Sequence, residues 1–344
     1  MSEQRTATFR AYFENPRKVL RPLVVSLNGD NSWLISIPRP RNEREDYGKA
    51  YFHIVYEPWL VGPVVTWATW FVRIGLPWLP KIEDGDAVEG LIDEIENAAA
   101  AAGFVPRPSE QSKPLADVIF LSMNLGDHTH EATLKTFDSN IPVFGTKDAA
   151  GLVQSWNHFD RVSTFSDLEP GNGNWLDLHP GAPLPKWLNF FQLPGHSQLN
   201  WASSITWTTE TGKHESLLMA PHVIKADHPS LQTFAHDLAP SVQTLAMFCP
   251  TKVSFTFGLQ TVLGASGSLA MARETKPKYW IKTADAALLY SGLVMRMMGV
   301  KDAWRTLDEA MEIEKKSGKE AQDVEAFVRP NLCEVNNGGC FVLE

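Results

Sequence analysis

A near-continuous apolar run, ADVIFLSM at residues 116–123, limits how this chain folds more than any other feature. A strand is apolar on both sides only where other layers cover both faces of its sheet, as in parallel sheets. Predicted helices follow the run at 131–137 and 147–156, with a short strand at 142–144 between them. This alternation of buried strands and helices predicts an α/β fold.

The other expected elements follow from residue type and spacing. Strands are predicted in the first part of the chain at 6–13, 22–28, 32–38 and 51–57. A helix is predicted at 85–102, with Asp84 or Asp86 as its N-cap, and a loop at 105–114. Further strands are predicted at 186–194, 199–210, 215–221, 241–248 and 276–284, and helices at 230–239, 258–275, 285–298 and 302–316. Because no linker divides these elements, residues 1–344 are predicted to form a single domain with decorated ends.

Charge and cysteine content argue against several classes of protein. The net charge is −9 and no block of Lys or Arg occurs, which argues against nucleic acid and against an anionic membrane surface as partners. The three cysteines are too few for a disulfide framework, although Cys333 and Cys340 are close enough in sequence to bridge. Since the N-terminus has no apolar stretch, the protein is expected to be cytoplasmic.

The segment 58–72, PWLVGPVVTWATWFV, is the part of the chain that most resembles a membrane span. It is shorter than the roughly 20 residues that a span needs, and Pro63 interrupts it, so no transmembrane segment is expected. It is predicted to be core or the wall of an apolar pocket, with an interfacial patch as the alternative. The same prediction covers the aromatic residues Trp59, Trp67, Trp70, Phe71 and Trp78. If they line a pocket, the ligand is an apolar small molecule.

Candidate metal ligands follow the apolar run in LSMNLGDHTHEATL, residues 121–134. Asp127 and His128 form a pair, and His130 comes two residues later. Carboxylate oxygen and imidazole nitrogen are ligands that zinc prefers, but these three residues do not complete a site. The alternative is a turn in which Asp127 caps the next helix and the histidines are exposed.

The strand, the Asp-His turn and the Thr-Leu that follows resemble the metal-binding motif of the metallo-β-lactamase superfamily. The most similar branch contains ascorbate-phosphate lactonases and N-acyl-phosphatidylethanolamine phospholipase D, whose motif reads His-x-His-x-Asp-His-Leu-Asp-x-x-Thr-Leu. The sequence DHTHEATL keeps Asp127, His128, Thr133 and Leu134 of it, with His130 at the second Asp. The resemblance implies an α/β, four-layer αββα sandwich of metallo-β-lactamase type.

Four other segments are similar to family segments in order and spacing: NGDNSWLISI with FHIVYEPWL, FQLPGHSQLNWASSITWTTE, SLLMAPHVI and KPKYWIKTAD. They place His196 at the third-motif histidine, His222 at the bridging Asp and Glu57 at a strand-end Asp. Glu57 is then either a hydrogen-bond acceptor behind the site or a solvated loop acid. The overall pattern is most similar to a degenerate, fungal-type member, with an expected role in secondary metabolism.

The resemblance also implies that the family's two-ion centre is incomplete. Met123 and Leu125 occupy the His-x-His positions, and Ala284 occupies the position of the last histidine. Leucine and alanine cannot bind a metal, and a thioether is a poor zinc ligand. The residues left are Asp127, His128, His196 and His222, with His130 as a fifth candidate. They imply either one divalent ion, such as Zn²⁺, Mn²⁺ or Fe²⁺, or no metal.

Two classes of function remain open from the sequence. The first is a hydrolase or lyase acting on an apolar ester, lactone or related carbonyl compound, in which the same four residues bind one ion or act directly as acid and base. The second is a catalytically inactive member that binds a ligand or partner. A homo-oligomer is compatible with both.

Overall fold

A computed structural model describes residues 3–14, 19–105, 114–316 and 328–344, so most of the loop predicted at 105–114 lies outside the described residues. The chain forms two compact units. Unit 1 comprises residues 1–64, 78–164 and 335–344, and unit 2 comprises 65–77 and 165–334. The single domain stays a prediction.

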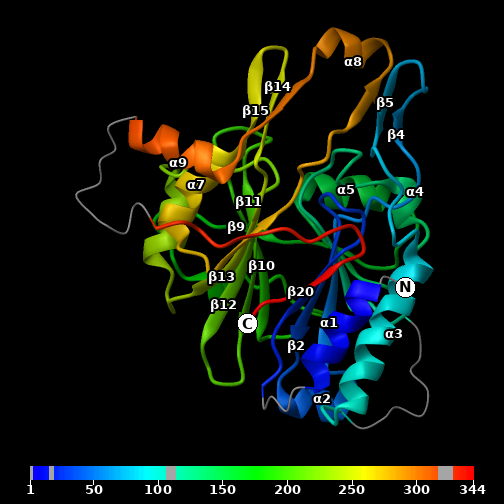
Figure 1. Ribbon diagram of the computed structural model, residues 1–344. Coiled ribbons are helices and arrows are strands. Elements are labelled where there is room, and N and C mark those ends of the chain that lie inside the picture. The colour runs from blue at the N-terminus through cyan, green and yellow to red at the C-terminus, as the bar shows by residue number, and fades with distance from the viewer. Residues whose placement is uncertain (1–2, 15–18, 106–113, 317–327) are drawn as a thin grey trace. The chain divides into compact units, whose positions relative to one another are not determined.

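Unit 1 contains a mixed seven-stranded sheet in the order β20-β1-β2-β3-β6-β7-β8. Its strands are β1 (Leu23–Ser26), β2 (Trp33–Pro38), β3 (Tyr51–Tyr56), β6 (Val118–Leu121), β7 (Val143–Gly145), β8 (Val162–Thr164) and β20 (Cys340–Val342). Its helices are α1 (Glu3–Glu14), α2 (Arg41–Tyr47), α3 (Gly85–Ala101), α4 (Glu131–Leu134) and α5 (Lys147–Ser155). Strands β3, β6, β7 and β8 run parallel, as the apolar run predicts, and α1 and α3 pack against the sheet through one core (Figure 1).

Unit 2 contains a second mixed seven-stranded sheet in the order β19-β16-β13-β12-β11-β10-β9. Its strands are β9 (Ser166–Asp167), β10 (Leu188–Leu193), β11 (Ala202–Thr208), β12 (His214–Met219), β13 (Gln243–Cys249), β16 (Tyr279–Lys282) and β19 (Leu332–Cys333). Two small sheets add β4 (Val64–Thr66), β5 (Val72–Gly75) and β17 (Leu289–Ser291), and β14 (Lys252–Thr256), β15 (Leu259–Leu263) and β18 (Lys301–Trp304).

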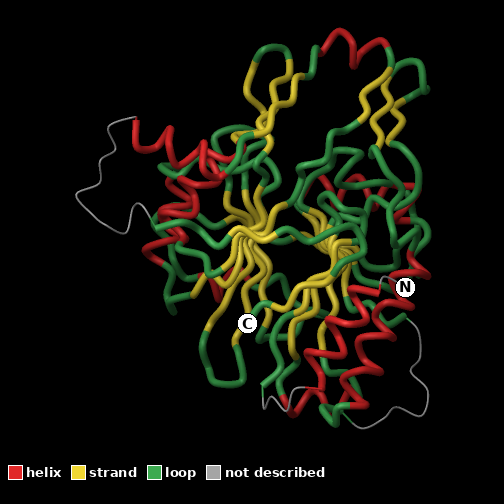
Figure 2. Tube along the Cα trace, viewed as in Figure 1, coloured by secondary structure: helices red, strands yellow, loops and turns green. Residues whose placement is uncertain are grey.

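The helical elements of unit 2 are η1 (Trp175–Leu178), α6 (Pro229–Gln232), the π-helical turn η2 (Thr233–Asp237), α7 (Gly264–Thr275), α8 (Leu293–Met298) and α9 (Leu307–Lys316). Helices α7 and α9 pack on one face of the large sheet through a shared apolar core, and Figure 2 shows them in red beside its yellow strands. No helix of the described residues is long and apolar enough to cross a bilayer.

Four predicted elements are wrong. The strand predicted at 6–13 is helix α1, because Phe9, Tyr12 and Phe13 are buried at helical spacing. The helix predicted at 258–275 begins as strand β15 and becomes helical only at Gly264, whose φ is +61°. The helices predicted at 285–298 and 302–316 likewise start as strands β17 and β18.

One prediction about single residues also fails: Trp67 and Trp70 are exposed rather than part of the core, whereas Trp59 is buried as expected. All three cysteines are free thiols, in agreement with a cysteine count too low for a disulfide framework.

Candidate functional site

The candidate site of unit 1 begins with a tight turn after β6. The backbone N–H groups of His128 and Thr129 both donate to the carbonyl of Leu125, and the Thr129 hydroxyl donates to the carbonyl of Met123. This turn reverses the chain and buries His128, which is only 4% exposed. Asp127 keeps about a quarter of its side chain in contact with solvent.

Glu57 directly follows β3 and contacts His128 of this turn. Its carboxylate is fully buried, and its backbone adopts a left-handed φ of +42°. Oε1 accepts hydrogen bonds from the backbone N–H and the hydroxyl of Ser122, and Oε2 accepts from Asn31 Nδ2 and His128 Nδ1, each at 2.6 Å. Four donors offset the cost of burying the charge. Glu57 is therefore a buried acceptor and not a solvated loop acid.

The protonation of His128 follows from its neighbours. Burial by itself lowers the pKa of this imidazole, but the carboxylate of Glu57 and then that of Asp127 outweigh burial and raise the pKa to about 9. Nδ1–H donates to Glu57, which leaves Nε2 on the side of Asp127, 3.9 Å from Oδ2. At neutral pH the ring is an imidazolium held between two carboxylates.

His130 fixes the start of helix α4. It is buried, and its Nδ1 accepts hydrogen bonds from the hydroxyl and the backbone N–H of Thr133, so that it forms the N-cap of α4. Burial lowers the pKa of His130, which keeps the ring neutral at pH 7. The alternative in which Asp127 caps the next helix and the histidines are exposed is therefore wrong.

Unit 2 places the other two predicted residues on adjoining loops. His196 follows β10 and is exposed, and its pKa is lowered by partial burial and by the nearby positive charge of Lys225. His222 follows β12, with Nδ1 3.2 Å from the carbonyl of Thr261. Asn200 joins the loops, because its Nδ2 donates to the carbonyl of His222 while its Oδ1 accepts from Ser197 in the His196 loop.

The side chains present do not fit the two-ion centre that the sequence resemblance implies. Met123, Leu125 and Ala284 stand where three of its histidines are expected, and none is a good zinc ligand. Among the described residues of either unit, no three His, Cys, Asp or Glu side chains are placed to hold one ion. Asp127 and His128 by themselves supply two ligands.

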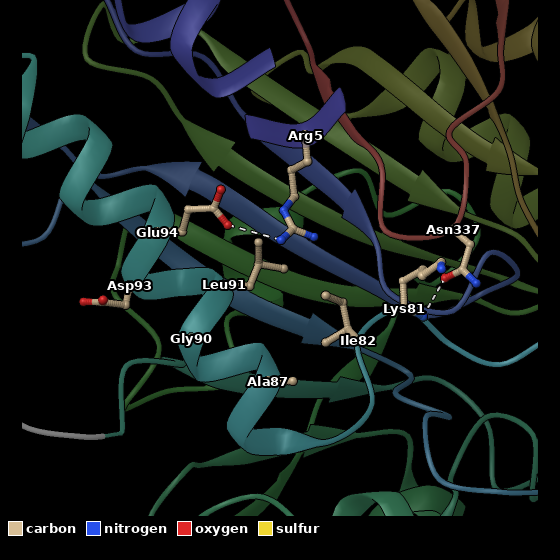
Figure 3. A pocket seen from close by; sticks show the side chains of 9 residues that line it. All are labelled: Arg5, Lys81, Ile82, Ala87, Gly90, Leu91, Asp93, Glu94 and Asn337. Atoms are coloured by element: carbon tan, nitrogen blue, oxygen red, sulfur yellow. Dashed lines mark hydrogen bonds and ion pairs between the residues drawn. The ribbon is translucent and has the colours of Figure 1, made fainter. Parts of the chain in front are cut away.

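A separate cavity of about 810 Å³ lies in unit 1 between α1, α3 and the C-terminal segment (Figure 3). Arg5 on one wall is ion-paired with Glu94 at 3.2 Å, and the backbone N–H of Lys81 donates to Asn337. None of the residues predicted from the sequence lines it. The cavity is therefore distinct from the candidate site.

Sequence reasoning missed Asn31 and Ser122, which complete the environment of Glu57. Asn31 lies in the turn NGDN, which indicates only a hairpin, and Ser122 directly follows the apolar strand. Polar residues at the ends of neighbouring strands were the available signal, since these ends meet at one edge of a sheet.

Comparison with known proteins gives structural matches only. No protein-family model and no curated protein matches the sequence. A solved structure of a possible metal-dependent hydrolase from Veillonella parvula aligns with a TM-score of 0.51 and 9% identity, covering 94% of this chain and all of that one. An isothiocyanate hydrolase from Delia radicum gut bacteria gives 0.49 and 10%, covering 94% and 100%. The metallo-β-lactamase-fold protein YhfI from Bacillus subtilis gives 0.46 and 9%, covering 93% and 99%.

At such low identity these likenesses concern the fold alone. The chain is an α/β protein with two mixed seven-stranded sheets, as predicted for its fold class, and it shares its overall fold with the Veillonella structure.

Proposed function

We propose that this protein is an enzyme of the hydrolase or lyase class that acts on an ester, lactone or related carbonyl compound by acid–base chemistry. The observation that carries the proposal is the 2.6 Å contact between Glu57 Oε2 and His128 Nδ1. A buried carboxylate that fixes one nitrogen of an imidazole orients the other nitrogen, as in many hydrolytic sites. The Veillonella structure, described as a possible metal-dependent hydrolase, supports the hydrolase class by analogy of fold.

The chemistry follows from the charges of the three side chains. His128, protonated at neutral pH, is the proton donor and stabilises negative charge that develops on a carbonyl or leaving-group oxygen. Asp127, partly exposed, is the base that takes a proton from water or from a carbon next to the carbonyl. Glu57 does not meet the substrate and positions His128.

The remaining predictions about the site stay part of the proposal. His196 and His222 are candidate acid–base or ligand residues of unit 2, and a single bound divalent ion is the second form of the site. The preference for an apolar compound stays a prediction, since Trp59 is buried in the core and Trp67 and Trp70 are exposed.

The test combines metal content with activity. The protein is purified without chelator or affinity metal, its metals are measured by mass spectrometry, and aryl esters and lactones are screened. His128→Gln should lower kcat/KM about 100-fold or more, the usual contribution of a general acid. His158→Gln is the matched control, since His158 is another hydrogen-bonded histidine of unit 1, bonded to the carbonyl of Phe137, that lies outside the site.

The outcomes distinguish the forms of the proposal. Turnover with no bound metal supports direct acid–base chemistry, whereas one full equivalent of metal that His128→Gln removes supports the single-ion site. Activity that survives in His128→Gln would contradict the assignment of this residue.

The burial of His128 favours a second candidate function, a catalytically inactive binding protein. All four donors to Glu57 come from within unit 1. A network of this kind is sufficient to hold the turn in place and does not require a catalytic role. No turnover of any compound, together with a large loss of stability in His128→Gln, would favour this alternative.

A further inference from the structure

Helix α8 and two hairpin turns of unit 2 are joined by backbone hydrogen bonds into one surface. Helix α8 is tied at its start to the β4–β5 turn, since the N–H groups of Leu293 and Val294 donate to the carbonyls of Trp70 and Phe71 at 2.8 and 3.0 Å. At the other end, the N–H of Phe257 in the β14–β15 turn donates to the carbonyl of Met298 at 2.8 Å. Figure 1 draws α8 and the tips of both hairpins at the same end of the unit.

This surface, which we call the apolar rim, carries six large apolar side chains that are each more than half exposed. They are Trp67, Trp70, Phe257, Leu259, Leu293 and Met297. Trp67 is 87% exposed, and its ring stacks on that of Phe71 with centroids 4.7 Å apart, so the aromatic side chains are held in place. Contiguous apolar groups of this kind mark sites of contact with another surface.

Backbone conformation gives an independent reason to assign a role to the rim. Trp67 has φ of +64°, and Phe257 has φ of +53° next to Gly258 at +76°. Left-handed positions in tight turns favour Asn, Asp and Gly, and they are unfavourable for bulky side chains. Both turns therefore keep an aromatic residue at the tip where a small polar residue would be more stable.

The charge of the rim is opposite to that of the chain. Segments 65–77, 254–263 and 287–302 contain Arg73, Arg296 and Lys301 and one acidic residue, Asp302, which accepts hydrogen bonds from Ser254 and Tyr290, although the whole chain carries −9. In the described part of the chain, none of the three cationic side chains is in an ion pair. The local charge of the rim is therefore positive and suits a negatively charged surface, although the net charge of the chain is negative.

We propose that the apolar rim docks on the surface of a lipid bilayer, with Trp67, Trp70 and Phe257 in the headgroup region and the cationic residues beside lipid phosphates. Tryptophan prefers this region because it combines an apolar body with a hydrogen-bonding N–H. A second copy of the chain is a poorer occupant, because a two-fold contact repeats the same patch and brings like charges together. The docking is peripheral, in keeping with the lack of a spanning helix among the described residues.

Vesicle flotation tests the proposal. The wild-type chain is mixed with phosphatidylcholine vesicles with and without phosphatidylserine, at low and high salt. We expect flotation with both, stronger with phosphatidylserine and weakened by salt. Trp67→Asn with Phe257→Asn should weaken binding about tenfold or more, as loss of one or two buried large apolar groups predicts. Arg296→Gln with Lys301→Gln should abolish only the preference for phosphatidylserine.

The variants separate binding from folding. Asparagine suits the left-handed positions, so Trp67→Asn and Phe257→Asn should unfold at the same or a higher temperature than wild type. Tyr47→Asn, which removes an exposed aromatic residue of unit 1, is the matched control and should bind as wild type does. The proposal fails if folded wild type binds neither vesicle, or if the rim variants bind equally well. It also fails if light scattering shows a dimer that the rim variants dissociate.

Discussion

Glu57 Oε2 lies 2.6 Å from His128 Nδ1, although 71 residues separate the two in the sequence. The contact exists because β3 and β6 are parallel neighbours, paired at Tyr56 and Phe120, so that the residues after both strands meet at one edge of the sheet. Removing either member of a buried carboxylate–imidazolium pair leaves the other as an uncompensated buried charge. Glu57 therefore controls the charge of His128.

Replacing the carboxylate by an amide should change the protonation of His128. In Glu57→Gln, burial still lowers the pKa of His128 while the largest opposing interaction is gone. We expect the pKa to fall from about 9 by roughly 1–3, the usual effect of one close opposite charge. NMR titration of ¹⁵N-labelled histidine measures this directly.

Asp127→Asn is the matched control for that titration. Asp127 is the second carboxylate near the ring, 3.9 Å from Nε2 and partly exposed, so its removal should lower the pKa of His128 less than Glu57→Gln does. An equal or larger change in Asp127→Asn would show that Glu57 is not the dominant partner.

The raised pKa of His128 predicts how stability depends on pH. The folded protein keeps this proton up to about pH 9, whereas the unfolded chain releases it near 6.5. The stabilisation is therefore complete below pH 6.5 and is lost as pH rises through 9. The free energy of unfolding should fall by about 3 kcal/mol across this window, because a tenfold change in proton affinity corresponds to about 1.4 kcal/mol.

Urea denaturation at several pH values measures this loss, and His128→Gln supplies the reference. The variant lacks the titrating group, so the difference in unfolding free energy between wild type and variant should shrink as pH rises from about 6.5 to about 9.5. A difference that stays constant with pH would mean that His128 is already neutral in the folded state.

The sequence predicted the parts of the site that depend on local pattern. The apolar run placed β6, and the turn after it placed Asp127 and His128 at the edge of the sheet. It did not predict that Asn31 and Ser122 also bond to Glu57, because these contacts depend on the order of strands in the sheet. The capping role of His130 was missed because histidine is not among the usual N-cap residues.

The errors in the fold have similar local causes. Thr and Phe in the segment 6–13 favour strands, but burial of Phe9, Tyr12 and Phe13 on one side decides for a helix. For α9 the sequence does contain a signal for the start of the helix, which the prediction did not use. Thr306 and Glu309 form a reciprocal capping box, in which the N–H of each residue bonds to the side chain of the other. This box marks the helix start that the predicted range 302–316 placed too early.

Thr133 should be among the most sensitive positions of unit 1. Its buried hydroxyl accepts hydrogen bonds from the N–H groups of Leu60 and Val61 at 2.8 and 2.9 Å and donates to His130. Thr133→Val keeps the shape but leaves one buried and one partly buried N–H group without an acceptor, at about 1–3 kcal/mol for a buried group. We expect chemical denaturation to show a loss of about 2–4 kcal/mol.

Thr211→Val is the control for this loss. Thr211 is exposed on the hairpin between β11 and β12, so its replacement should change stability by about 0.5 kcal/mol or less. Equal effects of the two substitutions would show that the backbone N–H groups of Leu60 and Val61 do not need the Thr133 hydroxyl as their hydrogen-bond acceptor.

Gly195 should be essential for the loop that carries His196. A Cβ atom at this position would lie 1.3 Å from the carbonyl oxygen of Asn200, so Gly195→Ala must push the two backbone segments apart. The displacement would break the hydrogen bonds from Asn200 Nδ2 to the carbonyls of His222 and Thr261. We expect a loss of more than about 2 kcal/mol in unfolding free energy. Hydrogen exchange should show the loss of protection concentrated in the 195–200 and 220–224 loops.

A helical glycine provides the matched control for the added methyl group. Gly151 lies in α5, where a Cβ atom would meet nothing within 4 Å, so Gly151→Ala should stabilise the protein by up to about 1 kcal/mol. The two Gly→Ala changes are therefore predicted to have opposite signs. If Gly195→Ala were neutral, the loops would not be packed as closely as the 1.3 Å approach requires, and His196 and His222 would not be held together through Asn200.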